Sequence, residues 1–299
     1  MKSKVLCVHC FLSVFAVWSS TLLYGQEVIA LWPNDEIPFS KPCDLVEKEK
    51  EAWGTRCVFD ITKPTLTFYP AKGDEISNKA VVVIPGGGYG LVAMYHEGHD
   101  VAERLAEAGI SSAVLKYRLP NPKSSDTPEN VPLADARRAI ELTRHKMTLL
   151  DIDSVQVGVL GFSAGSHLAS VASLWPVDES AQKPDFSVLI YGVTVPSQAN
   201  YDWLEESLYY RKMTDEEKKK HDLLSQVSQS TPPAFLVHAY DDDICPVEES
   251  TKYAERLVEY AVPVEMHLFQ SGGHGFGLGR EVDGTHQWLD LCVQWLYKL

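Results

Sequence analysis

Residues 155–165 have the sequence VQVGVLGFSAG. The first half is an apolar run that suits a buried strand, and the residues that follow, 166–172, suit a helix. A sharp turn from strand to helix would hold Ser163 exposed at the corner, with Gly161 and Gly165 on either side because side chains there would clash. The pattern predicts a nucleophile elbow. It is a weak signal by itself, since its three fixed residues arise by chance in about one sequence in ten.

A serine at such an elbow needs partners before it can act as a nucleophile. It requires a histidine to take its proton, a carboxylate to orient that histidine, and backbone N–H groups to bind the oxyanion. For this kind of turn, the order along the chain is oxyanion loop, serine, acid and histidine. The sequence offers a candidate for each, in that order.

The candidate oxyanion loop is the glycine-rich run PGGGYG at residues 85–90, which follows an apolar strand predicted at 80–84. Without Cβ atoms, Gly87 and Gly88 allow the backbone to present N–H groups to an anion. The position after an early central strand is where an oxyanion loop belongs. A plain glycine turn is the simpler alternative. A phosphate-binding loop is disfavoured because the run lacks the Lys-Ser/Thr ending and the dinucleotide-binding spacing.

Ten histidines compete for the role of base, and position decides among them. A loop after the last strand, predicted at 264–269, can place an imidazole over the elbow, and His274 lies in such a loop. His167 lies one helical turn beyond Ser163 and would point along its own helix, so we interpret it as a packing or hydrogen-bonding residue. Three further histidines are interpreted as structural: His96, His99 and His238.

Three consecutive aspartates, Asp241, Asp242 and Asp243, follow the strand predicted at 234–238. This is the loop after the penultimate strand, where the acid of a triad belongs. A solvated acidic loop is the alternative, and a cation site is disfavoured because no further ligands stand at regular spacing. One of the three aspartates must point inward if the chain has a triad.

Strand and helix patterns alternate along most of the chain. They predict an α/β fold with a mostly parallel central sheet and helices on both faces. The runs at 56–61 and 65–69 look like an antiparallel opening of that sheet, within and after a wrapping loop at 26–63. A polar insertion interrupts the alternation and predicts a small cap, about residues 196–231, above the carboxyl ends of the strands.

The predicted cap contains four aromatic residues and a basic run. The aromatic residues are Tyr201, Trp203, Tyr209 and Tyr210. They suit either stacking on a sugar or aromatic acyl group or packing of the cap onto the body, and packing is favoured. The sequence TDEE at 214–217 is a capping-box pattern, so the lysines at 218–220 are expected on a short solvated helix.

Length and composition suit a single domain, expected at residues 26–299, since 45% of the 299 residues are apolar. The first 25 residues combine a basic head with a short apolar body and predict a cleaved signal peptide. We therefore expect a secreted or periplasmic protein with no membrane insertion after cleavage. An uncleaved anchor is the alternative, but hydroxyl residues interrupt an apolar stretch of near-minimal length. The net charge of −14 disfavours nucleic acid and anionic membrane surfaces as partners.

Signal cleavage would leave four cysteines: Cys43, Cys57, Cys245 and Cys292. Their spacings match no zinc pattern. Cys43 and Cys57 are close in sequence and both lie in the irregular N-terminal arm of a chain that we expect to be exported. We therefore expect a disulfide between them, worth about 3 kcal/mol.

Several motifs together resemble the α/β-hydrolase esterases of the acetyl esterase and acetylxylan esterase group, which includes a feruloyl esterase branch. The resemblance runs from residue 32 to the C-terminus. Its motifs, each with the number of its first residue, are TKPTLT at 62, PGGGY at 85, EG at 97, LKYRLP at 115, DARRA at 135, GFSAG at 161, TPP at 231 and GGHGFG at 272. Pro85 stands where related lipases carry histidine, and Cys245 stands where the family carries valine. Neither is a triad position.

The resemblance implies an α/β-hydrolase fold and a serine esterase with no metal or organic cofactor. It places the acid four residues after His238 and four before Pro246, and that position is Asp242. The implied triad is Ser163, His274 and Asp242. The implied oxyanion donors are the backbone N–H groups of Ala164 and of Gly87 or Gly88. Glu97 and Arg118 are interpreted as loop-fixing residues.

The implied substrate is a small-molecule, oligosaccharide or polysaccharide ester with a short acyl group, chiefly acetate, as in acetylated xylan. Three alternatives stay open. The first is a feruloyl esterase. The second is a prolyl-type serine peptidase, disfavoured because such enzymes carry a large additional domain. The third is a non-catalytic carbohydrate-binding protein on a hydrolase scaffold, disfavoured by the intact order of serine, aspartate and histidine. The sequence leaves the oligomeric state open.

Overall fold

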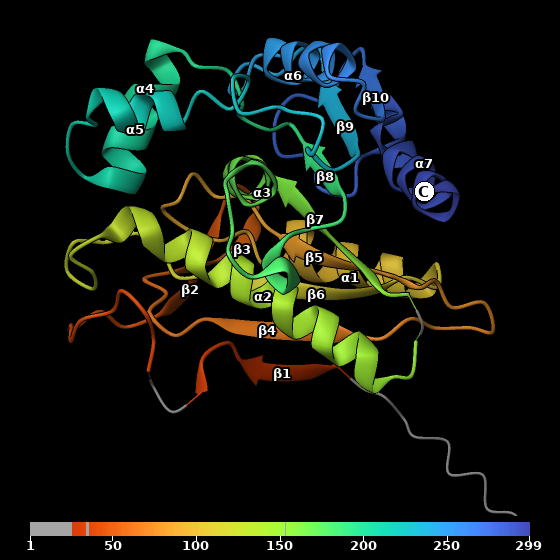
Figure 1. Cartoon of the computed structure of the whole chain (residues 1–299), viewed down its shortest axis with the longest axis horizontal. Helices are drawn as coiled ribbons and strands as arrows, with labels where there is room; N and C mark the ends of the chain where they lie inside the picture. Colours follow the sequence, from red (N-terminus) through yellow and green to blue (C-terminus); the bar gives the residue numbers. More distant parts are fainter. Residues whose placement is uncertain (1–25, 34–35, 153) are drawn as a thin grey trace, which may run out of the picture.

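A computed structural model describes residues 26–33, 36–152 and 154–299, so the predicted signal peptide at 1–25 lies outside the described residues. An eight-stranded sheet has the order β1-β4-β6-β5-β7-β8-β9-β10 (Figure 1). The strands are β1 (Glu27–Ala30), β4 (Thr65–Tyr69), β5 (Lys79–Ile84), β6 (Ser111–Lys116), β7 (Gln156–Phe162), β8 (Ser187–Ile190), β9 (Ala234–Ala239) and β10 (Val264–Phe269). The main helices are α1 (Asp100–Glu107), α2 (Val131–Leu149), α3 (Ala164–Leu174), α6 (Glu248–Glu259) and α7 (Trp288–Lys298).

The sheet is mostly parallel. The six neighbouring strands β6, β5, β7, β8, β9 and β10 pair in parallel. At one edge of the sheet, β4 pairs antiparallel with β6 and β1 pairs antiparallel with β4. Figure 1 shows α2 in front of the sheet and α1 behind it. The predicted α/β fold with a covered, mostly parallel sheet is confirmed. Among the described residues, no helix is both long and apolar enough to cross a membrane.

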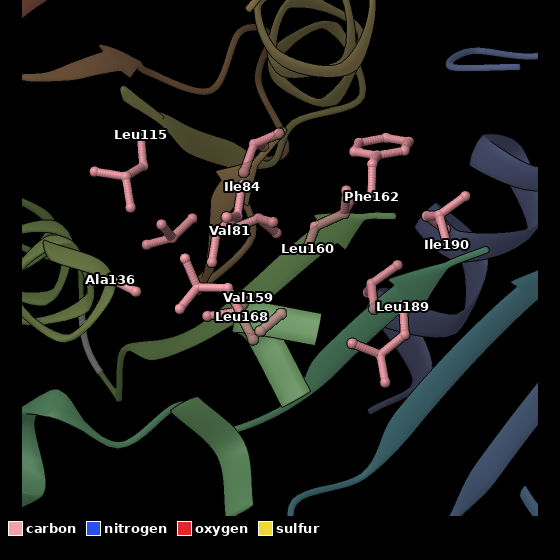
Figure 2. Close-up of a cluster of buried hydrophobic side chains, with 14 of the residues drawn as sticks. Val81, Ile84, Leu115, Ala136, Val159, Leu160, Phe162, Leu168, Leu189 and Ile190 are labelled. Carbon is pink, nitrogen blue, oxygen red and sulfur yellow. The ribbon is translucent and has the colours of Figure 1, made fainter. Parts of the chain in front are cut away.

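The centre of the core explains why the middle strands are continuous apolar runs. All six residues of β5 are buried, as are residues 157–162 of β7, because helices cover both faces of these strands. Figure 2 shows Val81 and Val159 in the same buried cluster as Ala136 of α2 and Leu168 of α3. Each fully buried aliphatic side chain of this size contributes about 1.5–3 kcal/mol. This packing fixes the strand end from which Ser163 emerges.

The antiparallel opening predicted from residues 56–61 and 65–69 is confirmed for the second run, which pairs antiparallel with its neighbours in the main sheet, and is wrong for the first run. The first run forms β3 (Thr55–Phe59), which pairs with β2 (Lys48–Ala52) in a separate two-stranded sheet. The second run is β4, whose neighbours are β1 and β6. Asp60 has a φ of 54°, which turns the chain away directly after β3. The segment predicted as a wrapping loop therefore contains an edge strand and a hairpin.

The helix that follows the glycine-rich loop is irregular at its start. Residues Tyr95–His99 form one π-helical segment, η2, and only then does α1 start at Asp100. Single π-helical turns are frequent at functional sites. Here the segment carries the buried Glu97 toward the glycine-rich loop.

The predicted cap segment contains α4 (Gln198–Leu204), the π-helical η5 (Glu205–Tyr209) and α5 (Asp215–Lys220), all between β8 and β9. Figure 1 shows α4 and α5 together at the upper left, apart from the sheet. The capping box predicted at the start of α5 is present, since Thr214 and Glu217 bond to each other's backbone N–H.

The predicted disulfide between Cys43 and Cys57 is wrong, because the four cysteines of the described part of the chain are all free thiols. Cys43 is exposed, whereas Cys57 is buried in β3 against Leu91 and Ala93. The Cys57 thiol faces the carbonyl oxygens of Ala52 and Thr55 at 3.8 and 3.7 Å. Burial raises the pKa of this thiol, so Cys57 behaves as a small core residue.

Candidate active site

Ser163 occupies the sharp corner between β7 and α3. Its φ of 51° and ψ of −120° are a strained conformation for a residue with a side chain, at a cost of about 1–3 kcal/mol. A Cβ on Gly161 would lie 2.3 Å from the carbonyl oxygen of Gly165, and a Cβ on Gly165 would lie 2.1 Å from that of Ile84. The corner therefore requires both glycines, as the nucleophile-elbow pattern predicts.

The structure brings Ser163, His274 and Asp242 into one hydrogen-bonded series. The His274 Nε2 lies 2.8 Å from the Ser163 Oγ, and its Nδ1 lies 2.8 Å from the Asp242 Oδ2. His274 comes from the loop after β10 and Asp242 from the turn after β9. The carboxyl ends of parallel strands share one edge of the sheet, so residues far apart in sequence meet there.

The three adjacent aspartates have different surroundings. The Asp242 side chain is buried, and its Oδ1 accepts hydrogen bonds from the N–H groups of Ile244 and Cys245 at 2.9 and 2.8 Å. Asp241 and Asp243 are exposed, and the Asp241 carboxylate accepts from the N–H of Gly273 at 2.8 Å. Only Asp242 among the three contacts the imidazole of His274.

A second histidine also contacts Asp242. The His238 Nε2 lies 2.8 Å from the Cys245 carbonyl oxygen and 3.3 Å from the Asp242 Oδ2, while its Nδ1 meets the Ser250 hydroxyl at 2.8 Å. A carbonyl only accepts, so Nε2 carries the proton. Sequence reasoning placed His238 among ordinary structural histidines and missed this contact.

Opposing effects set the charge of Asp242. Burial alone would raise the pKa of this carboxyl, but hydrogen bonds from His238 and His274 outweigh it and hold the pKa well below its usual range. Asp242 is therefore ionised at neutral pH. An ionised acid favours the tautomer in which His274 Nδ1–H faces Asp242, which leaves Nε2 free to accept the Ser163 proton.

The predicted oxyanion donors lie on the glycine loop and at the start of α3. Gly87 and Gly88 have φ values of 133° and 61°, and a Cβ on Gly87 would lie 2.1 Å from the Leu91 carbonyl oxygen. None of the described residues accepts a hydrogen bond from the N–H groups of Gly87, Gly88 or Ala164. These N–H groups are therefore available to a ligand, and Ala164 opens a helix, whose N-terminus favours negative charge.

The profile of the family described as the alpha/beta hydrolase fold matches residues 81–278, a span that contains Ser163, Asp242, His274 and the glycine loop at 85–90. The chain belongs to the alpha/beta hydrolase family.

Three relatives of this alpha/beta hydrolase carry informative names. An acetylxylan esterase of Xylanibacter ruminicola is 30% identical over 75% of this chain and 46% of its own length. An endo-1,4-beta-xylanase B of Butyrivibrio fibrisolvens is 29% identical over 70% of this chain and 34% of its own length. A solved acetyl ester-xyloside bifunctional hydrolase of Caldicellulosiruptor lactoaceticus is 32% identical, with a TM-score of 0.73 over 91% of this chain and 96% of its own. The chain thus spans less than half the length of the two curated relatives.

In this alpha/beta hydrolase, Glu97 is the buried centre of a network that sequence reasoning assigned only to loop fixing. Its Oε2 accepts from the Gly86 N–H at 2.8 Å, and its Oε1 accepts from the Tyr191 hydroxyl at 2.7 Å. The same hydroxyl accepts from the Gly277 N–H at 3.1 Å. Burial, then the nearby Glu97, raise the pKa of Tyr191 well above 10, so the hydroxyl keeps its proton. Tyr191 follows β8 and carried no local sequence signal.

Arg118, the other predicted loop-fixing residue, lies in a separate buried network that holds the N-terminal arm. It forms a buried ion pair with Asp135 at 2.7 Å and donates to the Pro38 carbonyl and the Ser40 hydroxyl at 2.7 and 2.8 Å. These contacts attach the N-terminal arm of the alpha/beta hydrolase to α2 and to the strand end of β6.

The four cap aromatics divide between packing and exposure. Tyr209 is buried, Tyr201 is half-buried, and Trp203 stacks on Tyr89 with ring centroids 5.5 Å apart. Tyr210 is 45% exposed. It borders a hollow lined also by Tyr89, Gly90 and Asn121, and a second hollow of about 200 Å³ lined also by Tyr209 and Arg211. Within the described residues, no group of three or more His, Cys, Asp or Glu side chains is placed to hold a metal ion.

Proposed function

We propose that this alpha/beta hydrolase is an exported serine carboxylesterase that removes short acyl groups, chiefly acetyl, from carbohydrate esters such as acetylated xylan. The observation that carries the proposal is the series of 2.8 Å contacts from Ser163 through His274 to Asp242. We assign the nucleophile to Ser163, the base to His274 and the orienting acid to Asp242. The oxyanion donors are Ala164 and Gly87 or Gly88.

The reaction proceeds in two halves. The Ser163 Oγ attacks the ester carbonyl carbon while His274 Nε2 takes the hydroxyl proton, and the carbonyl oxygen becomes an oxyanion held by backbone N–H groups. The tetrahedral intermediate then collapses to an acyl-serine, and His274 gives its proton to the departing alcohol. In the second half, water attacks the acyl carbon while His274 takes its proton. The bond between that carbon and the Ser163 Oγ then breaks, the acid product leaves, and His274 returns the proton to Ser163.

The buried environment of Asp242 suits its proposed role. When His274 becomes an imidazolium, the ionised carboxylate 2.8 Å away stabilises the new charge. The hydrogen bonds from Ile244, Cys245 and His238 keep Asp242 from taking the proton itself.

Two observations support a carbohydrate alcohol. The relatives described above are named for acetylxylan, xylan and acetyl ester-xyloside chemistry. In addition, Tyr210 offers an exposed aromatic face beside Gly90, two residues beyond Gly88 and so within about 8 Å of it along the chain. An exposed aromatic face suits one side of a sugar ring.

Export rests on the predicted signal peptide at residues 1–25. We propose one domain at 26–299, with the cap at about 196–231, that acts in the periplasm or outside the cell, where polysaccharide esters are found.

The decisive experiment separates the acyl groups. Purified protein is incubated with acetylated xylan and with feruloylated arabinoxylan, and released acetate and ferulate are measured separately, with Ser163→Ala as the control. Release of acetate by the wild type alone supports the proposal, and preferential release of ferulate supports a feruloyl esterase. Neither product, together with turnover of a proline-containing peptide, would point to a peptidase. No turnover of any ester would leave a carbohydrate-binding protein.

A further inference from the structure

Four buried polar side chains form a continuous chain beside the candidate active site, and the proposed mechanism uses none of them. The Tyr89 hydroxyl meets the His167 Nδ1 at 2.8 Å, and the His167 Nε2 meets the His221 Nδ1 at 3.3 Å. The His221 Nε2 meets the Tyr209 hydroxyl at 3.0 Å. At most 5% of the surface of any of the four is exposed.

The chain joins three parts of the molecule. Tyr89 follows Gly88 in the glycine loop, and His167 lies on α3, where its N–H donates to the Ser163 carbonyl oxygen at 3.0 Å. His221 and Tyr209 belong to the cap segment. The first contact therefore spans the two halves of the proposed oxyanion hole: the loop amides on one side and the Ala164 amide on the other.

The hydrogen bonds that join these four side chains must all donate in the same direction along the series. A neutral imidazole has one donor and one acceptor nitrogen, so one histidine donates to the other. If His167 Nε2 donates to His221, then Tyr89 donates to His167 and His221 donates to Tyr209; the reverse order is the only other complete arrangement. Burial lowers the pKa of His167 well below its ordinary value and, followed by nearby Lys220, lowers that of His221 to about 4, so both rings are neutral.

A second contact from the cap reaches the same loop. The indole N–H of Trp203 on α4 donates to the Gly88 carbonyl oxygen at 3.4 Å, and its ring stacks on Tyr89 at an interplanar angle of 18°. The ring of Tyr89 is thus held by its face and by its hydroxyl. Simple packing does not account for the pattern, because burying two imidazoles costs more than burying two apolar rings unless their hydrogen bonds are used.

We infer that Tyr89, His167 and the cap residue His221 are positioning residues that fix the Gly88 amide relative to Ser163, so that the cap completes the oxyanion hole. The inference rests on the proposed serine esterase mechanism. It predicts that breaking the chain weakens binding of the transition state and leaves binding of the ground-state ester almost unchanged.

The test uses Tyr89→Phe, which removes one oxygen and keeps the stack on Trp203, and His221→Phe, which keeps a ring in the cap. Tyr201→Phe is the matched control, because Tyr201 lies on the same cap helix as Trp203 and its hydroxyl makes no hydrogen bond within the described residues. The kcat and KM for p-nitrophenyl acetate are measured, together with the inhibition constant of an aryl trifluoromethyl ketone, which forms a tetrahedral adduct on serine. Active-site titration with a phosphonate corrects for misfolded protein.

We expect Tyr89→Phe and His221→Phe each to lower kcat about 10- to 100-fold and to weaken the ketone by a similar factor, with KM within about twofold of the wild type. The double variant should be no worse than the poorer single variant, because both changes break one chain. Tyr201→Phe should match the wild type.

Wild-type kcat per titrated site in both variants would overturn the inference while the esterase proposal stands. The same holds if the loss falls on KM with unchanged affinity for the ketone. A wild type that turns over no ester would instead overturn the proposed function and this inference with it.

Discussion

The ring of Tyr191 packs against the imidazole of His274, with centroids 4.8 Å apart and planes inclined at 59°. The hydroxyl of the same tyrosine bonds to Glu97 and receives the Gly277 N–H, so one side chain contacts both the histidine loop and the carboxylate that holds the glycine loop. Tyr191 and Glu97 therefore connect the position of His274 to that of the glycine loop at 85–90.

This link predicts the effect of Tyr191→Phe. The ring contact with His274 is kept, but the Glu97 carboxylate loses a buried donor, which costs about 1–3 kcal/mol of unfolding free energy. We expect a lower Tm and a kcat/KM for p-nitrophenyl acetate reduced about tenfold at a temperature where the variant is folded. An unchanged kcat/KM in a destabilised variant would assign Tyr191 to stability alone.

Replacing the proposed nucleophile gives the strongest effect on turnover. Ser163→Ala should lower ester turnover about a thousandfold or more, because binding and the oxyanion donors cannot replace the attacking oxygen. The Tm should stay close to that of the wild type, since the alanine side chain fits the space that the serine side chain occupies at the elbow. Rates of p-nitrophenyl acetate hydrolysis and a thermal melt check both statements, and near-normal turnover would refute the assignment.

The aspartate loop allows an internally controlled experiment. Asp242→Asn should lower turnover at least about a hundredfold, because His274 loses control of its tautomer and the partner of its imidazolium. Asp243→Asn, one residue away and exposed, should have little effect. Asp241→Asn should be intermediate, since that side chain accepts the Gly273 N–H beside His274. A larger loss for Asp241→Asn or Asp243→Asn than for Asp242→Asn in folded protein would contradict the assignment of the acid.

The buried histidines predict how stability depends on pH. The pKa of His221 is about 4 in the folded protein and about 6.5 in the unfolded chain, so between these pH values only the unfolded chain binds the proton. The free energy of unfolding should therefore fall as the pH falls from about 6.5 to 4, by at most about 3–4 kcal/mol from this residue, with no effect above pH 6.5. His99 and His167, whose pKa values burial also lowers, act in the same direction.

Urea unfolding at several pH values checks this prediction, and His221→Phe should show a shallower decline between pH 6.5 and 4 than the wild type. Asp242 acts in a separate window. Its pKa is lowered, so its contribution is present above about pH 4 and is lost only as the pH falls further. Equal slopes for wild type and His221→Phe would show that His221 is not held neutral.

Tyr210 provides a test of the proposed carbohydrate substrate. Tyr210→Ala should raise KM for acetylated xylo-oligosaccharides about fivefold, as expected for loss of one aromatic contact, and leave p-nitrophenyl acetate kinetics unchanged. Trp53→Ala removes another exposed aromatic, on the turn between β2 and β3, and serves as the control. Equal effects of both changes on the oligosaccharide would argue against a sugar contact at Tyr210.

The sequence was informative where function depends on local backbone. The apolar runs of β5, β7 and β9 and the glycines at the elbow impose a strand, a sharp turn and a covered sheet, and each left a pattern that could be recognised. The choice of Asp242 among three aspartates came from family resemblance, because periodicity alone does not say which residue of a loop points inward.

Long-range contacts left no such pattern. Tyr191 and Glu97 are separated by 94 residues, and His167 and His221 by 54, so the sequence around one residue does not identify its partner. β4 pairs with β1 and not with β3, and the chain has a positive φ at Asp60 directly after β3. Cys57 is a free thiol buried beside Leu91 and Ala93. These features follow from the packed structure and cannot be predicted from local sequence propensity.

Ser163 and His274 are 111 residues apart, and three strands of the sheet, β8, β9 and β10, lie between them in the sequence. The serine corner can form early, but the histidine reaches it only after the last strand has joined the sheet. Contacts of such long sequence separation are slow to form. We therefore expect recovery of ester turnover during refolding to lag behind recovery of helical circular dichroism, so that activity reports the final stage of chain assembly.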